Sequence, residues 1–223
     1  MSLYTITTLE TLPTIKQPAG LRIEESTDIT LLAAMGEIAE EEIIKRLANN
    51  HSAFIAYIHD QPATFGWMAK SKATIGELGH ELILPSGNRY LWNFRTLAAY
   101  RGLGIYPALL QYIIHYESKS ANQFWIIHAP ENRSSLSGIV KAGFKYTGKL
   151  YTNANGDTTL ELTALAESYR DILESMHIQL SNDTSASCWN CSSPYLKKRK
   201  PECCCSTAGS ECISNAMLSK HLI

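Results

Sequence analysis

A glycine-rich turn between a large apolar segment and an amphipathic segment constrains the fold of this chain most. Residues 89–97 carry large side chains at successive positions, so both faces of a strand here would be bulky. This predicts a central strand that is covered on both faces. Gly102 and Gly104 end this strand, and apolar residues then recur at helical spacing from Ile105 to Lys119. The order strand, glycine turn, helix indicates a domain of the α/β class.

The turn from Tyr100 to Tyr106 has the chemistry of an anion-binding loop. Backbone N–H groups at the start of a helix lack intrahelical acceptors, and the positive end of the helix dipole favours negative charge. Glycine allows a phosphate to approach closely and adopts positive φ at little cost. Arg101 adds a positive charge at the rim. A phosphate or pyrophosphate fits this turn, although an ordinary two-glycine turn would fit the sequence equally well.

Strand-like and helix-like segments follow one another over the rest of the chain up to about residue 180. A hairpin is predicted at Asn155–Gly156, and Thr27 or Asp28 is expected to cap the first helix. Further strands are predicted near 21–23, 52–59, 63–69, 76–84 and 124–129, and further helices near 132–142 and 164–177. We expect a central mixed sheet flanked by helices, organised as an extension (1–19), a domain (20–179) and a Cys-rich tail (180–223).

Composition and charge argue against several classes of protein. The net charge is −1, and Lys and Arg are scattered through the first 180 residues, so no strong field attracts nucleic acid. No segment approaches the roughly 20 apolar residues that span a bilayer, and residues 1–17 lack the pattern of a signal peptide. We therefore expect a cytoplasmic protein that binds neither nucleic acid nor membrane.

Two motifs follow each other along the chain: Arg101, Gly104 and Tyr106, and then Asn132, Ser135, Ile139, Gly143 and Phe144. From about Gly20 to Leu165 the sequence thereby resembles the Gcn5-related N-acetyltransferase (GNAT) family. The acetyl-CoA loop of that family has Arg or Gln, two residues, Gly, one residue, then Gly or Ala, so Tyr106 is a departure. Its next helix opens on Asn, with Ala or Ser three residues on, Tyr seven on, and Gly-Phe at the end.

The resemblance implies the GNAT fold and transfer of an acetyl or other short acyl group from acyl-CoA to an amine. It implies that the strand of residues 94–97 parts from its neighbour near Thr96 and Ile126 and that its backbone binds the pantetheine arm. It also implies that the loop N–H groups bind the pyrophosphate and that Asn132 with a serine lines the cofactor near its sulfur. For Asn132 the alternative is a plain helix cap. The implied acyl-CoA contacts are Phe94, Arg95, Thr96, Leu97, Arg101, Gly102, Leu103, Gly104, Ile105, Tyr106, Asn132, Ser134 and Ser135.

Catalytic side chains are less well marked, because Ile139 stands where the family has a tyrosine that protonates the leaving thiolate. A thiol with a pKa near 8.5 is a tolerable leaving group, so solvent or Tyr146 is expected to serve instead. Glu77 and Glu81, predicted on the polar face of one strand, are candidates for the general base, with surface solubility as the alternative. Asn93 is a candidate for orienting the substrate.

Other residues on the predicted strands leave two interpretations open. Trp67 and Trp92 either wall an acceptor pocket or belong to the core, where large aromatic side chains are common. His80 is expected to be a core histidine with a satisfied hydrogen bond, and the role of His128 stays open. The alternative to a transferase is a CoA-binding regulatory protein, which Ile139 suggests, or a zinc-bearing interaction protein.

All six cysteines follow residue 187, so the domain itself needs no disulfide. The spacing of Cys188 and Cys191 suits two thiolates on one metal, and Cys203 and Cys205 are expected to complete a zinc site. The alternatives are a flexible tail with reactive thiols, an iron–sulfur centre or a regulated disulfide. A basic run at residues 196–200 leaves a protein partner for the tail open.

Overall fold

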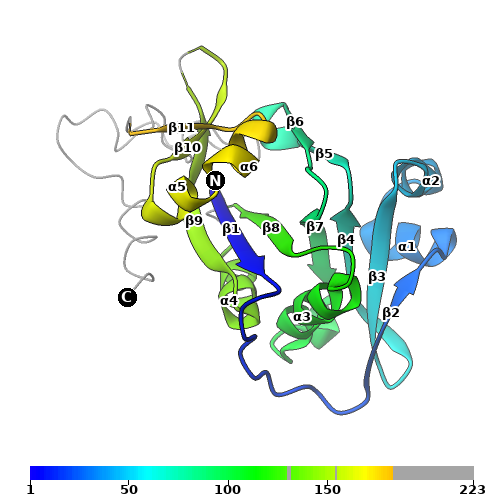
Figure 1. The fold of residues 1–223 in the computed structure, drawn as a ribbon. Helices are drawn as coiled ribbons and strands as arrows, with labels where there is room; N and C mark the ends of the chain where they lie inside the picture. Colours follow the sequence, from blue (N-terminus) through cyan, green and yellow to red (C-terminus); the bar gives the residue numbers. More distant parts are fainter. Residues whose placement is uncertain (130–131, 154, 183–223) are drawn as a thin grey trace, which may run out of the picture.

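The computed structural model describes residues 1–129, 132–153 and 155–182 (Figure 1). The first half contains β1 (Ser2–Thr7), β2 (Leu21–Ser26), α1 (Ile29–Gly36), α2 (Glu40–Ala48), β3 (His51–Ile58), β4 (Gln61–Ala69), β5 (Lys72–Ile75), a 3₁₀ turn (Gly76–Leu78), β6 (His80–Ile83) and β7 (Asn88–Thr96). A second 3₁₀ turn (Ala98–Tyr100) is followed by α3 (Ile105–Glu117), β8 (Gln123–His128), α4 (Arg133–Ala142), β9 (Lys145–Thr152), β10 (Thr158–Glu161), α5 (Ala164–Ser168), α6 (Arg170–Ser175) and β11 (Gln179–Ser181).

One large mixed sheet organises these elements. Among the described residues it has nine strands in the order β11-β10-β9-β1-β8-β7-β4-β3-β2, and β5 and β6 form a separate hairpin. Neighbouring strands are antiparallel except for β7 with β8 and β10 with β11, which are parallel. The predicted class, an α/β protein with a central mixed sheet flanked by helices, is therefore confirmed.

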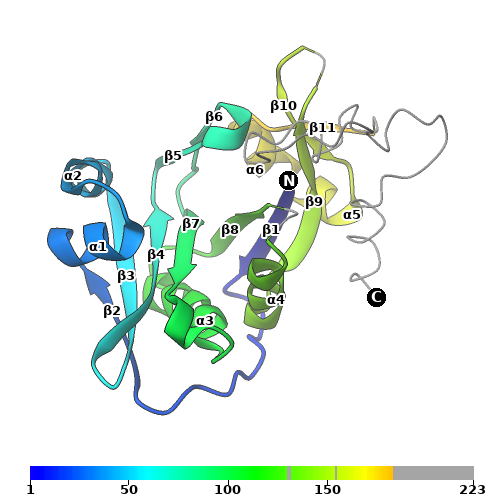
Figure 2. The same cartoon turned by 180° about the vertical axis from the view of Figure 1, so that it is seen from behind.

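Helices cover both faces of this sheet, and the alternation of strand side chains shows which face each helix covers. Phe54, Met68 and Leu91 pack with α3 and α4 in one cluster. On the other face, Ile55 and Trp67 pack with α1 and α2, whereas other strand residues pack with α5, α6 and the β5–β6 hairpin. Figures 1 and 2 show α1 and α2 at the opposite end of the sheet from α5 and α6.

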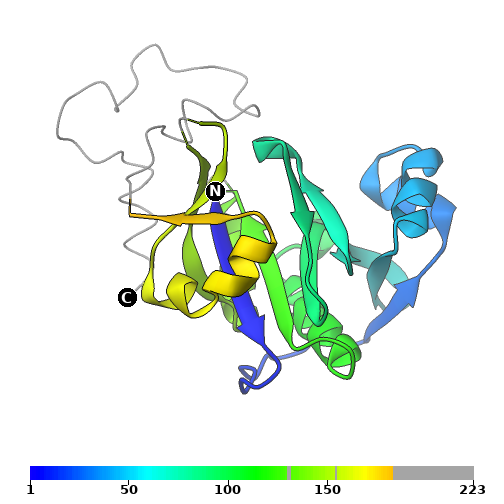
Figure 3. The ribbon, with the colours of Figure 1, turned by 45° about the horizontal axis from the view of Figure 1, so that its top comes forward.

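The N-terminal strand lies inside the sheet, although the sequence analysis placed residues 1–19 in an extension. In β1, Tyr4 pairs with Ile126 of β8 on one side and with Tyr146 of β9 on the other. Figure 3 shows this blue strand among green and yellow-green strands from the second half of the chain. Leu3, Tyr4 and Ile6 are buried. This pairing is non-local, so the short sequence of β1 does not indicate it.

Two other predicted elements are divided in the structure. The strand predicted over 76–84 is instead a 3₁₀ turn followed by β6, because Gly79 adopts a φ of +61° and reverses the chain. The helix predicted over 164–177 is divided into α5 and α6 at Tyr169. By contrast, Asp28 caps α1 as predicted, accepting a hydrogen bond from the Leu31 N–H at 2.9 Å. In the part of the chain that the structure describes, no helix is both long and apolar enough to span a membrane.

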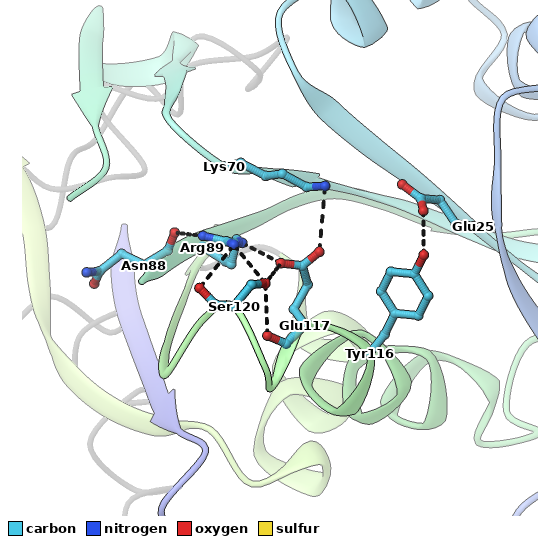
Figure 4. A network of polar contacts seen from close by, with 7 residues as sticks. All are labelled: Glu25, Lys70, Asn88, Arg89, Tyr116, Glu117 and Ser120. Carbon is cyan, nitrogen blue, oxygen red and sulfur yellow. Dashed lines mark hydrogen bonds and ion pairs between the residues drawn. The ribbon is translucent and has the colours of Figure 1, made fainter. Parts of the chain in front are cut away.

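A buried ion pair fixes the end of α3 to the start of β7 (Figure 4). Arg89 Nε donates to Glu117 Oε2 at 2.8 Å, and Ser120 Oγ donates to the same oxygen at 2.7 Å. Lys70 Nζ lies 3.6 Å from Glu117 Oε1. Burial alone would raise the pKa of Glu117, but the hydrogen bonds from Ser120 and Arg89 and the charges of Arg89 and Lys70 hold the pKa below its ordinary value.

We predict that Glu117→Ala lowers the free energy of unfolding by about 3 kcal/mol, because it leaves Arg89 buried without its counter-ion. Glu25→Ala is the control. Glu25 is an exposed acceptor of the hydroxyl of Tyr116, the neighbour of Glu117 on α3. Its loss should lower the free energy of unfolding by less than about 1 kcal/mol. Urea unfolding at pH 7 measures both. The stabilisation by Glu117 is fully present above the unfolded-state pKa and is lost as the pH falls through the lower folded-state pKa. Equal effects of the two variants at pH 7 would contradict this assignment.

Candidate functional site

Two parallel strands part at the centre of the sheet. β7 pairs with β8 from Asn88↔Gln123 to Leu91↔Ile126, and among the described residues no pair continues beyond that point. β7 itself runs on to Thr96, where its other edge still pairs with Thr64 of β4. The backbone edge of residues 92–96 therefore faces the opening between β7 and β8. The sequence analysis expected a parting at this place, near Thr96 and Ile126.

A β-bulge in β7 lies at the start of this opening. Trp67 of β4 pairs with Trp92, but Phe65 pairs with Arg95, so β7 has one extra residue opposite Gly66. Asn93 takes a left-handed φ of +51° in this bulge, a conformation that Asn tolerates better than most residues.

Gly66 is needed opposite the bulge for a steric reason. A Cβ on Gly66 would lie 2.1 Å from the ring of Phe94, so only glycine leaves room for that ring. Phe94 thereby packs against the cluster that contains α3 and α4. A bulge bends the strand and increases its local twist, which turns β7 away from β8.

The glycine turn stands at the end of β7, directly before α3. Gly102 and Gly104 have φ values of +80° and +78°, and Gly104 is the N-cap residue of α3. No acceptor among the described residues bonds the N–H groups of 102–104, and the first N–H groups of α3 have no intrahelical acceptor. A Cβ on Gly102 would meet nothing within 4 Å. The turn thus presents several free donors and the positive end of a 13-residue helix.

Two arginines flank this turn in different ways. Arg101 is exposed, and its Nε donates to the Thr96 carbonyl at 3.2 Å, which holds its guanidinium at the rim of the turn. Arg95 points to the link between α1 and α2, where its Nη2 lies 2.5 Å from Glu37 Oε1. Hydrogen bonding to Arg95 and its charge lower the pKa of Glu37. Leu97 is held by its N–H, which donates to the Ala63 carbonyl at 2.9 Å.

The second predicted motif opens α4 on the other side of the parted strands. Asn132 is the N-cap residue, and its Oδ1 accepts from the Ser135 N–H at 3.1 Å and from Ser134 Oγ at 3.0 Å. The capping role considered for Asn132 is therefore present. Gly143 ends the helix with a φ of +104°, as its sequence position predicts.

Tyr106 joins the two helices across this region. Its ring lies 5.3 Å from that of Phe94, centroid to centroid, and its Oη lies 3.4 Å from Ser135 Oγ. Burial raises the pKa of Tyr106 well above its ordinary value, so the hydroxyl is neutral at physiological pH. A Cβ on Gly138 of α4 would lie 2.2 Å from Cδ1 of Tyr106. The large residue at the third position of the loop motif is thus matched by a glycine on the neighbouring helix.

We predict that the effect of Gly138→Ala on the free energy of unfolding changes sign with the residue at position 106. In the native background the new methyl group collides with the Tyr106 ring and should lower the free energy of unfolding by about 1–3 kcal/mol. In a Tyr106→Ala background the same change should stabilise the protein by about 0.5–1 kcal/mol, because alanine favours helix over glycine. Urea unfolding of the four proteins tests this. The same sign in both backgrounds would show that the two residues do not constrain each other.

The predicted acid and base candidates do not gather in one place. Glu77 lies in the 3₁₀ turn and Glu81 in β6, so they do not share the face of one strand as expected. Glu81 is exposed and pairs with Lys72, its Oε1 3.3 Å from Nζ. It lines a pocket with His80, His177 and neighbouring residues of β6, α6 and the turn between β9 and β10, and no residue of β7 or the glycine turn lines that pocket.

The tyrosine considered as a substitute acid already has a partner. Tyr146 donates from its hydroxyl to Glu161 Oε2 at 3.0 Å, and burial together with the Glu161 charge raises its pKa far above the ordinary value. Ile139 is fully buried among the apolar residues of α3 and α4. The hydroxyl that lies between those two helices belongs to Tyr106 instead.

The two histidines considered from the sequence, His80 and His128, both lie within hydrogen-bonding distance of backbone carbonyl oxygens. His80 Nε2 lies 3.0 Å from the Met176 carbonyl oxygen, which agrees with the expected satisfied histidine, although the residue is only partly buried. His128 is buried, and its Nε2 lies 2.9 Å from the Asn132 carbonyl oxygen at the start of α4.

A polar cluster of Arg46, His51, Trp67 and Trp92 lies on the face of the sheet opposite α3 and α4. Only its two tryptophans were candidates from the sequence. Trp67 and Trp92 lie side by side, and Arg46 of α2 lies over both rings, with Cζ 5.3 Å and 4.6 Å from their centroids. His51 meets the Trp92 ring edge-on at 5.4 Å. These residues come from α2, β3, β4 and β7, so only the fold brings them together.

The expected zinc ligands Cys188, Cys191, Cys203 and Cys205 lie outside the described residues. Within residues 1–129, 132–153 and 155–182, no group of three or more His, Cys, Asp or Glu side chains is placed to hold a metal ion.

No protein-family model matches this sequence, and no curated protein does either. Several solved structures similar to this one are described as acetyltransferases, and some of these as members of the GNAT family. A predicted acetyltransferase from Clostridium acetobutylicum, solved with acetyl-CoA, is 17% identical with a TM-score of 0.40, over 56% of this chain and 90% of that one. A GNAT acetyltransferase from Novosphingobium aromaticivorans is 14% identical with a TM-score of 0.46, over 65% and 59% of the two chains.

An aminoglycoside acetyltransferase from an uncultured soil metagenomic sample, solved with sisomicin, is 14% identical with a TM-score of 0.42, over 56% of this chain and 88% of that one. Each of these TM-scores is below 0.5, so these similarities carry no functional argument.

Proposed function

We propose that this protein is an N-acyltransferase that passes an acetyl or other short acyl group from acyl-CoA to an amine. The proposal is carried by one observation: a glycine turn with free N–H donors stands at the mouth of two parallel strands that part. The sequence motifs of the GNAT family fall on this turn and on the helix across the opening. We propose that the chain has the fold of that family.

The glycine turn suits the pyrophosphate of acyl-CoA. The N–H groups of 102–104 and of the first turn of α3 would donate to it, and Arg101 would add a positive charge at the rim. Because Gly102 and Gly104 both have positive φ, the backbone itself forms this cradle. Lys16 also lies here, since its carbonyl oxygen is 3.8 Å from where a Cβ on Gly104 would stand.

The open edge of β7 suits an extended chain with amide groups, as the pantetheine arm of acyl-CoA is. Main-chain hydrogen bonds to an exposed strand edge bind such a chain without demanding particular side chains. Residues 92–96 provide this edge, and two of their side chains are engaged elsewhere, Phe94 in the core and Arg95 with Glu37. Bound acyl-CoA would supply the activated thioester, and the opening would hold the thioester beside the start of α4.

On the far side of the opening, α4 contributes its N-terminus. Asn132, Ser134 and Ser135 lie there, and the remaining donors of the first helical turn favour developing negative charge. Much of the acceleration of acyl transfer comes from holding two reactants together, so this site requires few catalytic side chains. The alternative, a protein that binds CoA without transfer, would use the same turn and is favoured only by the buried Ile139.

Calorimetric titration of acetyl-CoA and desulfo-CoA into the wild type and Gly104→Glu tests the proposed cofactor. We expect micromolar binding by the wild type and at least a tenfold weaker binding by the variant, because glutamate puts bulk and negative charge among the free donors. Gly79→Glu is the matched control, since Gly79 also has a positive φ and open space around it but lies in the β5–β6 turn.

Both variants should fold with a similar loss of stability, and only Gly104→Glu should lose binding. No binding by the wild type would overturn the proposed function. Binding without turnover of any amine in a broad panel would favour the CoA-binding alternative.

A further inference from the structure

The cluster of Arg46, His51, Trp67 and Trp92 contains buried polar atoms that nothing in the described residues satisfies. These atoms are Arg46 Nη1, His51 Nδ1, Trp67 Nε1 and Trp92 Nε1, and each is shielded from solvent. An unpaired buried donor costs free energy, so native proteins rarely leave even one. Four such atoms in neighbouring side chains favour the binding of a polar group at this cluster.

Three of the four atoms are donors. The two indole nitrogens and the guanidinium Nη1 can only donate. Trp67 is fully buried, and the side chain of Arg46 is only 12% exposed. Arg46 Nε already donates to Glu42 Oε1 at 3.0 Å, which leaves Nη1 for another acceptor.

The fourth atom is an acceptor. His51 Nε2 lies 2.9 Å from the Lys72 carbonyl oxygen, which only accepts, so the proton of the neutral ring is on Nε2. Burial, followed by the Arg46 charge, lowers the pKa of His51 despite its bond to Lys72. His51 Nδ1 therefore carries a lone pair beside the donors.

The cluster adjoins the proposed acyl site. Trp92 is the first residue of β7 beyond the paired segment that ends at Leu91, and the residue as a whole is only partly buried. Trp92 packs between two groups of core residues, one under α1 and α2 and the other under α5 and α6. Both groups lie on the face of the sheet opposite α3 and α4. The ion pair of Arg95 in β7 with Glu37 holds the link between α1 and α2 against this strand.

We infer that the three donors of this cluster, Arg46 Nη1, Trp67 Nε1 and Trp92 Nε1, bind the carboxylate of the acyl acceptor. The acceptor is then an amine that carries a carboxylate, as amino acids do. Three donors exceed the two lone pairs of a single carbonyl oxygen, whereas a carboxylate offers two oxygens and about four acceptor positions. A planar guanidinium also matches a carboxylate well. This inference rests on the proposed acyltransferase function, since the cluster alone does not identify the transferred group.

The test follows the indole N–H signals of ¹⁵N-labelled tryptophan while N-acetylglycine or N-acetylalanine is added, with the corresponding primary amides as matched uncharged probes. The carboxylates should move the Trp67 and Trp92 signals, and the amides should bind at least about tenfold more weakly. Trp125 is an internal reference, because its Nε1 already donates to Asn88 Oδ1 at 2.8 Å. Equal responses to acid and amide, or no response of Trp67 and Trp92, would overturn the inference.

Arg46→Gln should abolish the preference for the carboxylate, and Arg22→Gln should leave it intact. Arg22 is the matched control because it also lies over an aromatic ring, with Cζ 4.2 Å from the Tyr57 centroid, but is half exposed. If Arg46→Gln does not fold, Trp92→Phe removes the indole N–H together with the five-membered ring and should weaken binding of the acid more than binding of the amide. A preference that survives these changes would contradict the assignment.

Acetyl-CoA affinity, measured by calorimetry on the same proteins, separates this inference from the proposed function. Arg46→Gln should bind acetyl-CoA as the wild type does. A protein that binds acetyl-CoA yet shows no carboxylate preference refutes the inference alone, whereas a wild type that does not bind acetyl-CoA refutes the proposed function.

Discussion

The parting of β7 from β8 is the constraint on which the rest of the site depends. β7 pairs with β4 from Tyr90 to Thr96, across the bulge, but with β8 over four residues only, from Asn88 to Leu91. Beyond that point the bulge at Asn93, made possible by Gly66, turns the strand and leaves a backbone edge open. The helices that follow each strand, α3 and α4, begin at this opening, so their positive ends and free N–H groups converge there. At the other end, the pair of Arg89 and Glu117 fixes α3 to β7.

The opening has a different chemistry on each face of the sheet. On the face of α3 and α4, donors come from the backbone, and glycines rather than side chains shape the surface. On the opposite face, donors come from Arg46 and two tryptophans, held by packing against α1 and α2. This division suits the proposed reaction of two substrates. Acyl-CoA would be bound through the phosphate and amide groups that every acyl-CoA shares, and the acceptor would be selected by side chains.

Local sequence patterns predicted much of the fold but few of its long-range pairings. The strand, glycine turn and helix from residue 89 onward were predicted because each depends on neighbouring residues: bulk on both strand faces, glycines at positive φ and helical spacing. The strand β1 was assigned to an extension, since its place between β8 and β9 depends on partners more than 100 residues away. Glu77 and Glu81 were placed on one strand because the turn at Gly79 has little local signal. Arg46 and His51 were missed because an ordinary helix end and strand start come together with the tryptophans only in three dimensions.

We propose that the glycine turn is an anion-binding cradle at the mouth of the parted strands. Backbone amide signals of ¹⁵N-labelled protein, followed during titration with desulfo-CoA, report on this turn residue by residue. We expect the largest changes at Gly102, Leu103 and Gly104, with smaller ones along residues 92–96 of β7. Changes confined to other regions, such as the pocket beside His80 and His177, with the turn unaffected, would contradict it.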